Sequence, residues 1–470
     1  MPRRGVRQHA SRTRLGQAMF ELRKARKLGQ QEVAVAMGVH PDKVRRFEYD
    51  QLPRPKEISR FCEALHLSEE ESKELMRVFW QSGLGEKPSE EAKSYGWGAS
   101  NVFSDAYAIL YSAEAPVSYA YKQQSEMTAS VANEHTGHSG GLQGLRVLDL
   151  GSGYGQTTLA VMAYCPEQII AVDRAAGMVN MFEHVLLSQG NIDIWLRSKG
   201  ADELLEDLYA KTAAHLRWMR ATYEKSLFRK RGGQLMVLNE DIMTLDPQTI
   251  GLFHCIIANN SLHWPIKERQ KEIMQARRDV TDEDALAQAI PEVLKRLASL
   301  LRPGGILVAM EPKAFISFDK EEDKDLENEL TANTLTENSI YRKFHLTLQH
   351  LLKEKYDRDY EIPEKPSGYP MSKLDTLAKE GGFTMKRWWH RDVTFVGDAL
   401  TTCFTLFPLT LGSIDLPFSV KVELGRQVRR EIPAMLTDED AMTPIREQQF
   451  YLVFQRLDDP VVTLQPTTIT

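Results

Sequence analysis

Short apolar segments of strand length alternate with segments of helical periodicity along much of the chain. The clearest strand candidates are LRVLDLG, QIIAVD, QLMVLNED and FHCIIANN, and the turn GSGYG and the helical spacing of QTTLAVMAY follow the first of them. Further along, an amphipathic helix with Ile290, Val293, Leu294 and Leu297 on one face leads through Pro-Gly-Gly into ILVAMEP. Because strands that alternate with helices form parallel sheets, the pattern predicts an α/β fold with a doubly wound sheet.

The N-terminal segment has a different pattern, that of several short helices. Apolar residues from Leu15 to Leu22 recur at helical spacing, and a second helix, QQEVAVAMG, ends at Gly38. In the next segment, VHPDKVRRFEYD, His40 or Asp42 can cap a third helix. A short helix, a turn that contains glycine and another helix form the helix-turn-helix pattern.

Composition and charge also divide the chain in two. With 470 residues it is too long for one ordinary core, and 42% hydrophobic with 26% charged residues is typical of a globular protein. The net charge is -6, but residues 1–60 carry 15 Lys and Arg against six Asp and Glu, so the remainder is strongly acidic. A basic N-terminal segment favours a polyanionic partner.

Several classes of protein are disfavoured. No apolar segment approaches the ~20 residues that span a bilayer, and the basic N-terminus lacks the apolar core of a secretory signal. The four cysteines, Cys62, Cys165, Cys255 and Cys403, lie far apart without a CxxC pair, which argues against a zinc site and a disulfide framework. We therefore expect a cytoplasmic protein without a membrane span or a metal site.

The basic segment resembles the phage-repressor (XRE type) DNA-binding domain over roughly residues 12–80. It departs from the family at Pro41 and at Tyr49-Asp50, where a glycine commonly follows the Glu. The family's pattern matches at Leu15, Leu22, Arg23, Gln31, Glu32, Ala34, Gly38, Val39, Val44, Arg46, Phe47 and Glu48.

This resemblance implies that residues 1–85 bind double-stranded DNA. Repressor-type domains often act as dimers, so a homodimer is one expected state. The alternative is a helical docking domain whose basic face is only solvated. The side chains expected to face DNA are Gln31, His40, Lys43, Arg45 and Arg46.

Three glycines follow the first predicted strand in the pattern D-x-G-x-G-x-G, from Asp149 to Gly155. Gly151, Gly153 and Gly155 permit positive φ and a close approach of the backbone to a ligand, and the next helix offers free N–H groups. A phosphate-binding P-loop needs GxxxxGK(S/T), and a dinucleotide site needs glycine or alanine at the position of Gln156. The spacing therefore disfavours both kinds of site.

This turn resembles the first motif of class I S-adenosylmethionine-dependent methyltransferases, and four further segments follow in the family's order. QIIAVDRAAGMV places Asp173, next to Arg174, where a carboxylate can accept hydrogen bonds from both ribose hydroxyls. In QLMVLNEDIMTLD the resemblance implies that Asp241 accepts from the adenine amine and that Ile242 packs on the ring. FHCIIANNSLHWP, with Asn259, matches the motif that lines the methyl-transfer site. The helix before ILVAMEP is common across the fold.

The resemblance thus implies S-adenosyl-L-methionine as the cofactor. The residues expected to hold it are Asp149, Gly151, Gly153, Gly155, Asp173, Arg174, Asp241, Ile242 and Asn259. An all-α helix-turn-helix domain would occupy residues 1–85, and a Rossmann-like, seven-stranded methyltransferase domain residues 86–470. In the latter, LDTLAKEGGFTMKRWWHRDVTF resembles the last helix and sixth strand, and QFYLVFQRL would be the seventh strand. The core is expected at about 143–312 and 370–457, with helical insertions at about 188–233, 313–369 and 398–447.

Motifs that the sequence lacks reduce the number of candidate classes of methyl acceptor. Methylation of a base amine usually goes with a (D/N/S)PP(Y/F/W)-like turn after the fourth strand, where this chain has NNSLHW. Methylation of cytosine C5 needs a nucleophilic Cys, usually after Pro, and the adjacent pair here is reversed, Cys165-Pro166. The SLHW turn instead resembles the small-molecule branch, which implies an apolar or amphipathic organic acceptor.

His263 in the same turn is the candidate catalytic residue. Its side chain is the one there with a pKa suited to proton removal near neutrality. Methyl transfer from a sulfonium is an in-line displacement, which needs a base only when the nucleophile must lose a proton. The alternative is a hydrogen-bonded histidine that stabilises the turn.

Three functions stay open at this stage. The first is a small-molecule methyltransferase whose DNA-binding domain couples it to transcriptional regulation. The second is a transcription regulator whose methyltransferase-like domain senses S-adenosylmethionine or a metabolite. The third is an RNA or protein methyltransferase.

Overall fold

The computed structural model describes the helix-turn-helix segment, the sheet and most of the helices around it. The described residues are 14–49, 53, 55–68, 70–72, 74–75, 78, 105–113, 116, 119–277, 279–312, 316–317, 340–357, 359–360, 368–395, 423–428, 430–431 and 445–457. No helix within these ranges is long and apolar enough to cross a membrane.

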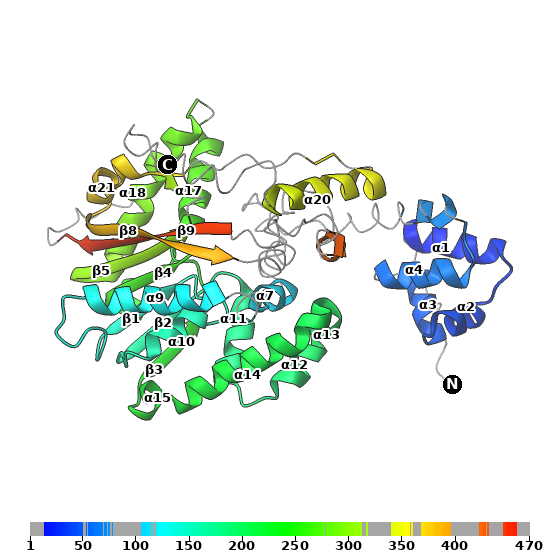
Figure 1. Ribbon diagram of the computed structural model, residues 1–470, viewed down its shortest axis with the longest axis horizontal. Coiled ribbons are helices and arrows are strands. Elements are labelled where there is room, and N and C mark those ends of the chain that lie inside the picture. Colours follow the sequence, from blue (N-terminus) through cyan, green and yellow to red (C-terminus); the bar gives the residue numbers. More distant parts are fainter. Residues whose placement is uncertain are drawn as a thin grey trace, which may run out of the picture.

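Seven strands form one sheet, in the order β3-β2-β1-β4-β5-β9-β8 (Figure 1). They are β1 Arg146–Leu150, β2 Gln168–Val172, β3 Gln234–Leu238, β4 Phe253–Asn259, β5 Leu301–Pro312, β8 Phe383–Phe395 and β9 Ile445–Arg456. The first five are parallel, whereas β9 is antiparallel to both β5 and β8. This order confirms the predicted Rossmann-like, seven-stranded class I methyltransferase fold. Two short segments, β6 Ile316–Ser317 and β7 Tyr369–Pro370, pair separately.

Helices cover both faces of the sheet, which explains why its central strands are rich in apolar residues and buried along most of their length. One face carries α7 Asp105–Ser112, α9 Tyr119–His135, α10 Gln156–Met162, α11 Ala176–Phe182 and α14 Tyr209–Lys225. The other carries α17 His263–Ala276, α18 Asp282–Leu300 and α21 Met371–Glu380. Along β5, Met310 packs on the first face and Ala309 on the second, as the alternation of a strand requires.

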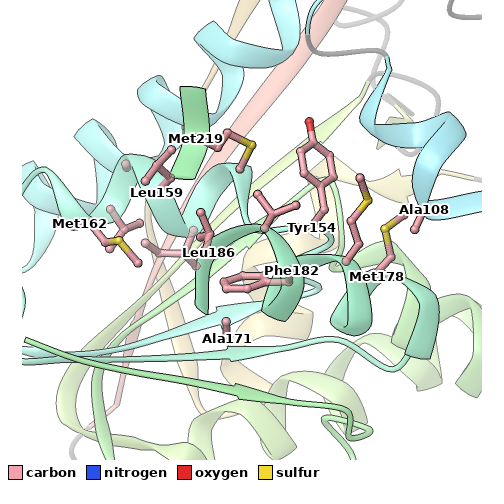
Figure 2. Packing of buried hydrophobic residues seen from close by; sticks show 14 of the residues in the cluster. Ala108, Tyr154, Leu159, Met162, Ala171, Met178, Phe182, Leu186 and Met219 are labelled. Atoms are coloured by element: carbon pink, nitrogen blue, oxygen red, sulfur yellow. The ribbon is translucent and has the colours of Figure 1, made fainter. Parts of the chain in front are cut away.

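Helices of the 188–233 region extend the first face. Besides α14 they are α12 Ile192–Ser198, α13 Ala201–Leu205, the 3-10 helix η3 Glu206–Leu208 and α15 Leu227–Lys230, and the π-helix η2 Glu183–Leu187 directly precedes the region. Figure 2 shows Phe182 of α11 over Ala171 of β2, with Leu186 and Met219 further out in the same buried cluster. The side chains of these helices therefore cover the face that carries the glycine turn.

The helix-turn-helix segment packs in a buried cluster that is separate from the two clusters of the sheet. Its helices are α1 Arg14–Ala25, α2 Gln30–Met37, α3 Pro41–Phe47 and α4 Pro55–Ala64. Gly38 ends α2 with a φ of 68°, and His40 begins α3 by accepting a hydrogen bond on Nδ1 from the Asp42 N–H, as one of the two predicted caps. Arg23 pairs with Glu48 through two hydrogen bonds, and both side chains are buried.

Two segments of the C-terminal half lie between the sheet domain and the helix-turn-helix segment. They are α20 Ile340–Tyr356, which is yellow in Figure 1, and the helical residues 423–428, which are orange. Lys355 Nζ of α20 donates to Gln427 Oε1 at 2.9 Å. The remaining residues of the predicted insertions 313–369 and 398–447 lie largely outside the described ranges.

Candidate functional site

The glycine turn connects β1 to α10, and its three glycines differ in what surrounds them. All have positive φ, of 64°, 54° and 95° for Gly151, Gly153 and Gly155. A Cβ on Gly151 would meet Ser261 Cβ at 2.5 Å, and one on Gly155 would meet the Phe182 ring at 2.7 Å. At Gly153 no atom of the described residues lies within 4 Å of that position. Two glycines are thus required by packing, and Gly153 leaves open space for a ligand.

Asp149 of β1 stabilises the turn by joining β1 to α10. Its side chain is 1% exposed, and Thr158 Oγ1 donates to Oδ2 at 2.5 Å, which ties α10 to β1. Burial raises the pKa of Asp149 to about 7, the Thr158 hydrogen bond opposes this shift, and the nearby Asp173 adds to it. Within the described ranges, Asp149 Oδ1 and Ser152 Oγ are buried polar atoms without a hydrogen-bond partner.

Asp173 directly follows β2 and lies beside the turn. Its Oδ2 accepts from the Gly153 N–H at 2.8 Å and its Oδ1 accepts from the Ala175 N–H at 2.8 Å. Burial raises the pKa of Asp173 to about 6, against the effect of these two hydrogen bonds. Each oxygen of the carboxylate can accept a further hydrogen bond, so Asp173 can still bind hydroxyl groups.

Asp241 and Arg174 lie together after β3 and β2. Arg174 Nη1 lies 2.9 Å from Asp241 Oδ2 and 2.8 Å from Glu268 Oε1, while Asp241 Oδ1 accepts from the Met243 N–H. Ile242 is 5% exposed and belongs to the buried cluster of the second face. The residues predicted for ribose and adenine are therefore adjacent, and Arg174 links two of their elements to α17.

Asn259, at the end of β4, is the centre of a polar network. Its Oδ1 accepts from Gln124 Nε2 and from Thr128 Oγ1, both at 3.1 Å, and its Nδ2 donates to Thr157 Oγ1 at 2.8 Å. Gln449 Nε2 of β9 extends the network by donating to Gln124 Oε1 at 3.1 Å. The amide of Asn259 thus joins α9, α10 and β4, and it is saturated by contacts within the protein.

His263, the candidate base, lies at the start of α17 against the end of β5. Its Nδ1 is 2.7 Å from Glu311 Oε2, and the side chains are 6% and 0% exposed. Glu311 Oε1 accepts from the backbone N–H groups of Leu262 and His263, which fixes the carboxylate against the ring. The proton on Nδ1 that this contact favours leaves the lone pair of the neutral imidazole on Nε2.

Further polar atoms lie on the same face of the sheet as Glu311. In the strand register Phe450 pairs with Glu311 and with His390, and Gln448 pairs with Asp392 on the same face. The His390 and Phe450 rings lie 5.6 Å apart. Gln448 Oε1 and His390 Nδ1 are buried and make no hydrogen bond within the described part of the chain. His390 Nδ1 lies 3.8 Å from Asp392 Oδ1. This face therefore combines a carboxylate–imidazole pair, aromatic surface and two buried polar atoms that make no hydrogen bond among the described residues.

Aromatic side chains cover the other face of the turn. The Tyr154 ring, between Gly153 and Gly155, makes edge contacts with Tyr111 of α7 and with His215 of α14. His215 Nε2 is 3.0 Å from Gln156 Oε1, and burial lowers the pKa of His215 to about 4. An uncharged His215 therefore joins the 188–233 helices to the first residue of α10.

Sequence reasoning missed Glu311, Gln124, Gln448 and His215. Each approaches the site across a strand pair or a helix contact between segments far apart in the chain. Within the described residues no group of three His, Cys, Asp or Glu side chains is placed to hold a metal ion.

The residues predicted to contact DNA lie on α2 and around α3. Gln31, His40, Arg45 and Arg46 are exposed. Lys43 forms an ion pair with Glu57 of α4 and is 28% exposed. The structure thus presents four of the five predicted side chains to solvent, and it uses Lys43 to join α3 to α4.

One family model matches the N-terminal part of the chain. A family model described as a helix-turn-helix domain matches residues 14–75, so this part of the chain, here called the head, is a helix-turn-helix domain. No curated protein matches the chain.

Solved structures resemble the remainder. The YcgJ protein from Bacillus subtilis is 10% identical, with a TM-score of 0.31, over 72% of this chain and 99% of that one. An S-adenosylmethionine-dependent methyltransferase from Methanosarcina mazei is 13% identical, with a TM-score of 0.29, over 67% and 94%. The cyclopropane synthase MmaA2 from Mycobacterium tuberculosis is 10% identical, with a TM-score of 0.33, over 69% and 82%. Because these TM-scores are below 0.5, the fold class rests on the strand order and register given above.

Proposed function

We propose that the protein is an S-adenosylmethionine-dependent methyltransferase that acts on a small organic molecule and carries a DNA-binding head. The observation that carries this proposal is the turn after β1, where Gly153 opens onto space beside the Asp173 carboxylate. Backbone N–H groups and a carboxylate in this arrangement suit a nucleoside better than a pyrophosphate.

Asp173 accepts the ribose hydroxyls in this proposal, with its orientation fixed by the Gly153 and Ala175 N–H groups. Asp241 accepts from the adenine amine, and Arg174 holds its carboxylate in place. Asp149 supports the turn, and Asn259 positions the end of β4 through its links to α9 and α10. When bound, the cofactor supplies an electrophilic methyl group on a sulfonium.

The acceptor lies, in this proposal, on the face that holds His263 and Glu311. Glu311 orients the imidazole so that Nε2 can take a proton from a hydroxyl or N–H nucleophile. Gln448 Oε1 and His390 Nδ1 can accept hydrogen bonds from such a molecule, while Phe450 offers apolar surface. These features favour an aromatic or amphipathic acceptor with an ionisable group.

The head binds double-stranded DNA in this proposal, through Gln31, His40, Arg45 and Arg46. Their exposure, the family match and the local positive charge support this role. A regulatory role of the methyltransferase domain follows from the fusion of the two parts in one chain.

Incubation of the full chain with cell extract and methyl-labelled cofactor tests the reaction. We expect label in one small molecule, and we expect His263→Ala to slow its incorporation by about 100-fold while cofactor affinity is retained. Label in RNA or protein would establish the third function instead. Cofactor binding without any labelled product would favour the sensor, and an unchanged rate in His263→Ala would remove the role of this residue as the base.

A further inference from the structure

The buried core of the head continues into the insertions of the methyltransferase domain. The cluster that contains Val33, Val44 and Phe61 of the head also contains apolar side chains of α20 and of residues 423–428. We call the latter set the seam; it consists of Leu348, Leu351, Leu352, Leu424 and Val428, which are all at most 1% exposed. Leu75 and Val78 belong to the same cluster. Apolar packing, rather than a linker alone, therefore joins the head to this region.

Side chains beside the seam also bind the helices of the 188–233 region, which cover the face of the sheet with the glycine turn. Arg426, between Leu424 and Val428, donates from Nη2 to the Leu204 carbonyl of α13 at 2.6 Å. Its Nη1 lies 3.6 Å from Glu206 Oε1, and Arg430 also approaches Glu206. Glu206 has a φ of 49°, a conformation that a side chain such as Glu rarely adopts, so these contacts hold a strained position.

From α13 the contacts continue to the cofactor site. α13 packs on α7, and Lys199, which follows α12, pairs with Asp105 of α7 at 2.6 Å. The same Asp105 accepts from Asn180 of α11 at 3.3 Å. α11 begins three residues after Asp173, whose carboxylate holds the glycine turn. An unbroken series of packed helices and ion pairs thus connects the seam to the proposed ribose contact.

We infer that occupancy of the cofactor site controls DNA binding by the head through this series, with Arg426 as the link. A ligand between the glycine turn and α11 stabilises α7 and α13, and through Arg426 it stabilises the helix on which the head packs. The inference rests on the proposed function, because it needs both ligands.

Whether the cofactor strengthens or weakens DNA binding depends on which surfaces of the head stay exposed when it packs on the seam. The predicted DNA contacts Gln31, His40, Arg45 and Arg46 are exposed and lie outside the seam cluster. Packing on the seam therefore restricts the head without covering its DNA-binding face. A restricted head loses less freedom on binding, so cofactor should strengthen DNA binding. Linkage then requires DNA to strengthen cofactor binding by the same factor.

The experiment measures both affinities on the full chain. S-adenosylhomocysteine is titrated by calorimetry with and without a short DNA duplex, and the labelled duplex is titrated by fluorescence anisotropy with and without S-adenosylhomocysteine. We expect each ligand to lower the Kd of the other by about 5-fold or more, by equal factors. In Arg426→Ala each ligand should bind alone as in the wild type, and the mutual effect should disappear.

The matched control is Arg217→Ala. It removes an ion pair between α14 and α12, where Arg217 contacts Asp193. This variant should keep the mutual effect. Both ligands binding to the wild type without any mutual effect would overturn the inference and leave the proposed function standing. Failure of either ligand to bind would overturn both.

Hydrogen exchange of the wild type gives a second readout that does not depend on the folding of a variant. S-adenosylhomocysteine should slow exchange of the backbone N–H groups in 340–356 and 423–428. Unchanged exchange there, with slowed exchange at the glycine turn, would contradict the inference.

Discussion

Two carboxyl groups lie at the glycine turn, the buried Asp149 and the partly buried Asp173, and each has a raised pKa because the folded chain removes it from water. Within the described part of the chain no cation pairs with Asp149, and Thr158 supplies a neutral hydrogen bond that only partly offsets the cost of burial. With a pKa of about 7, Asp149 is partly ionised near neutral pH, and this buried charge opposes folding.

Ionisation of Asp149 should make the free energy of unfolding depend on pH. The pKa of Asp149 is about 7 in the folded chain and roughly 4 in an unfolded one, so the folded state binds more protons between these values. The free energy of unfolding then falls as pH rises through this range. Asp149→Asn cannot ionise, so the loss of stability between about pH 5 and about pH 8 should be smaller by about 1–3 kcal/mol.

Urea unfolding of both proteins at the two pH values checks this expectation. Asp173 is present in both, so the comparison isolates the titration of Asp149 together with its coulombic interaction with Asp173. Equal pH dependence in the wild type and Asp149→Asn would show that Asp149 is not protonated in the folded chain.

At single residues, the sequence located the glycine turn because a local motif determines its geometry. The spacing D-x-G-x-G-x-G identified the turn, and the structure brings Asp173 to it through the pairing of β1 with β2. Glu311 could not be found in this way. It meets His263 only because β4 and β5 are neighbours in the sheet, and no spacing along the chain records that contact.

At the scale of elements, the three glycines in the strand–turn–helix unit from β1 to α10 serve two purposes, close packing and open space. Gly151 and Gly155 allow Ser261 and Phe182 to pack against the turn, whereas Gly153 borders open space. The unit therefore has tightly packed positions on either side of an open one, which is where we propose that the ligand binds.

Gly153→Ala and Gly155→Ala should differ in what they lose. Both place a side chain at positive φ, which costs about 1–2 kcal/mol. In Gly155→Ala the overlap with Phe182 brings the total loss of stability to about 2–4 kcal/mol. Gly153→Ala should lose only the backbone part, yet weaken S-adenosylhomocysteine binding by at least about 10-fold, because its Cβ enters the open space.

Thermal unfolding and calorimetry on the two variants separate these effects. A Gly153→Ala protein that binds S-adenosylhomocysteine as tightly as the wild type would place the ligand elsewhere.

The order of elements was accessible from the sequence because β1, β2, β4 and β5 are continuous apolar segments between clear turns. The arrangement of helices in 188–233 was not. Their amphipathic spacing predicted helices, and the structure shows one of 17 residues and several of one to two turns. Tertiary contacts such as His215 with Gln156 determine where they lie.

At the scale of the whole molecule, the sequence predicted a basic helix-turn-helix domain and a methyltransferase fold, and both are present. The contact between them was not predictable. The segment that became α20 is amphipathic, and amphipathic spacing does not tell whether the apolar face packs on its own domain or on another. In the structure Leu348 and Leu351 pack in the same buried cluster as the head.

The central claim is that the site around the glycine turn binds an adenosyl cofactor. Calorimetric titration of the full chain and of Asp173→Ala with S-adenosylhomocysteine tests it most directly. We expect one site per chain in the wild type, with affinity that increases as pH rises through about 6, where Asp173 ionises. The Asp173→Ala variant should bind more weakly by about 1–3 kcal/mol. No binding by the wild type, or equal affinity in both proteins across this pH range, would contradict the account.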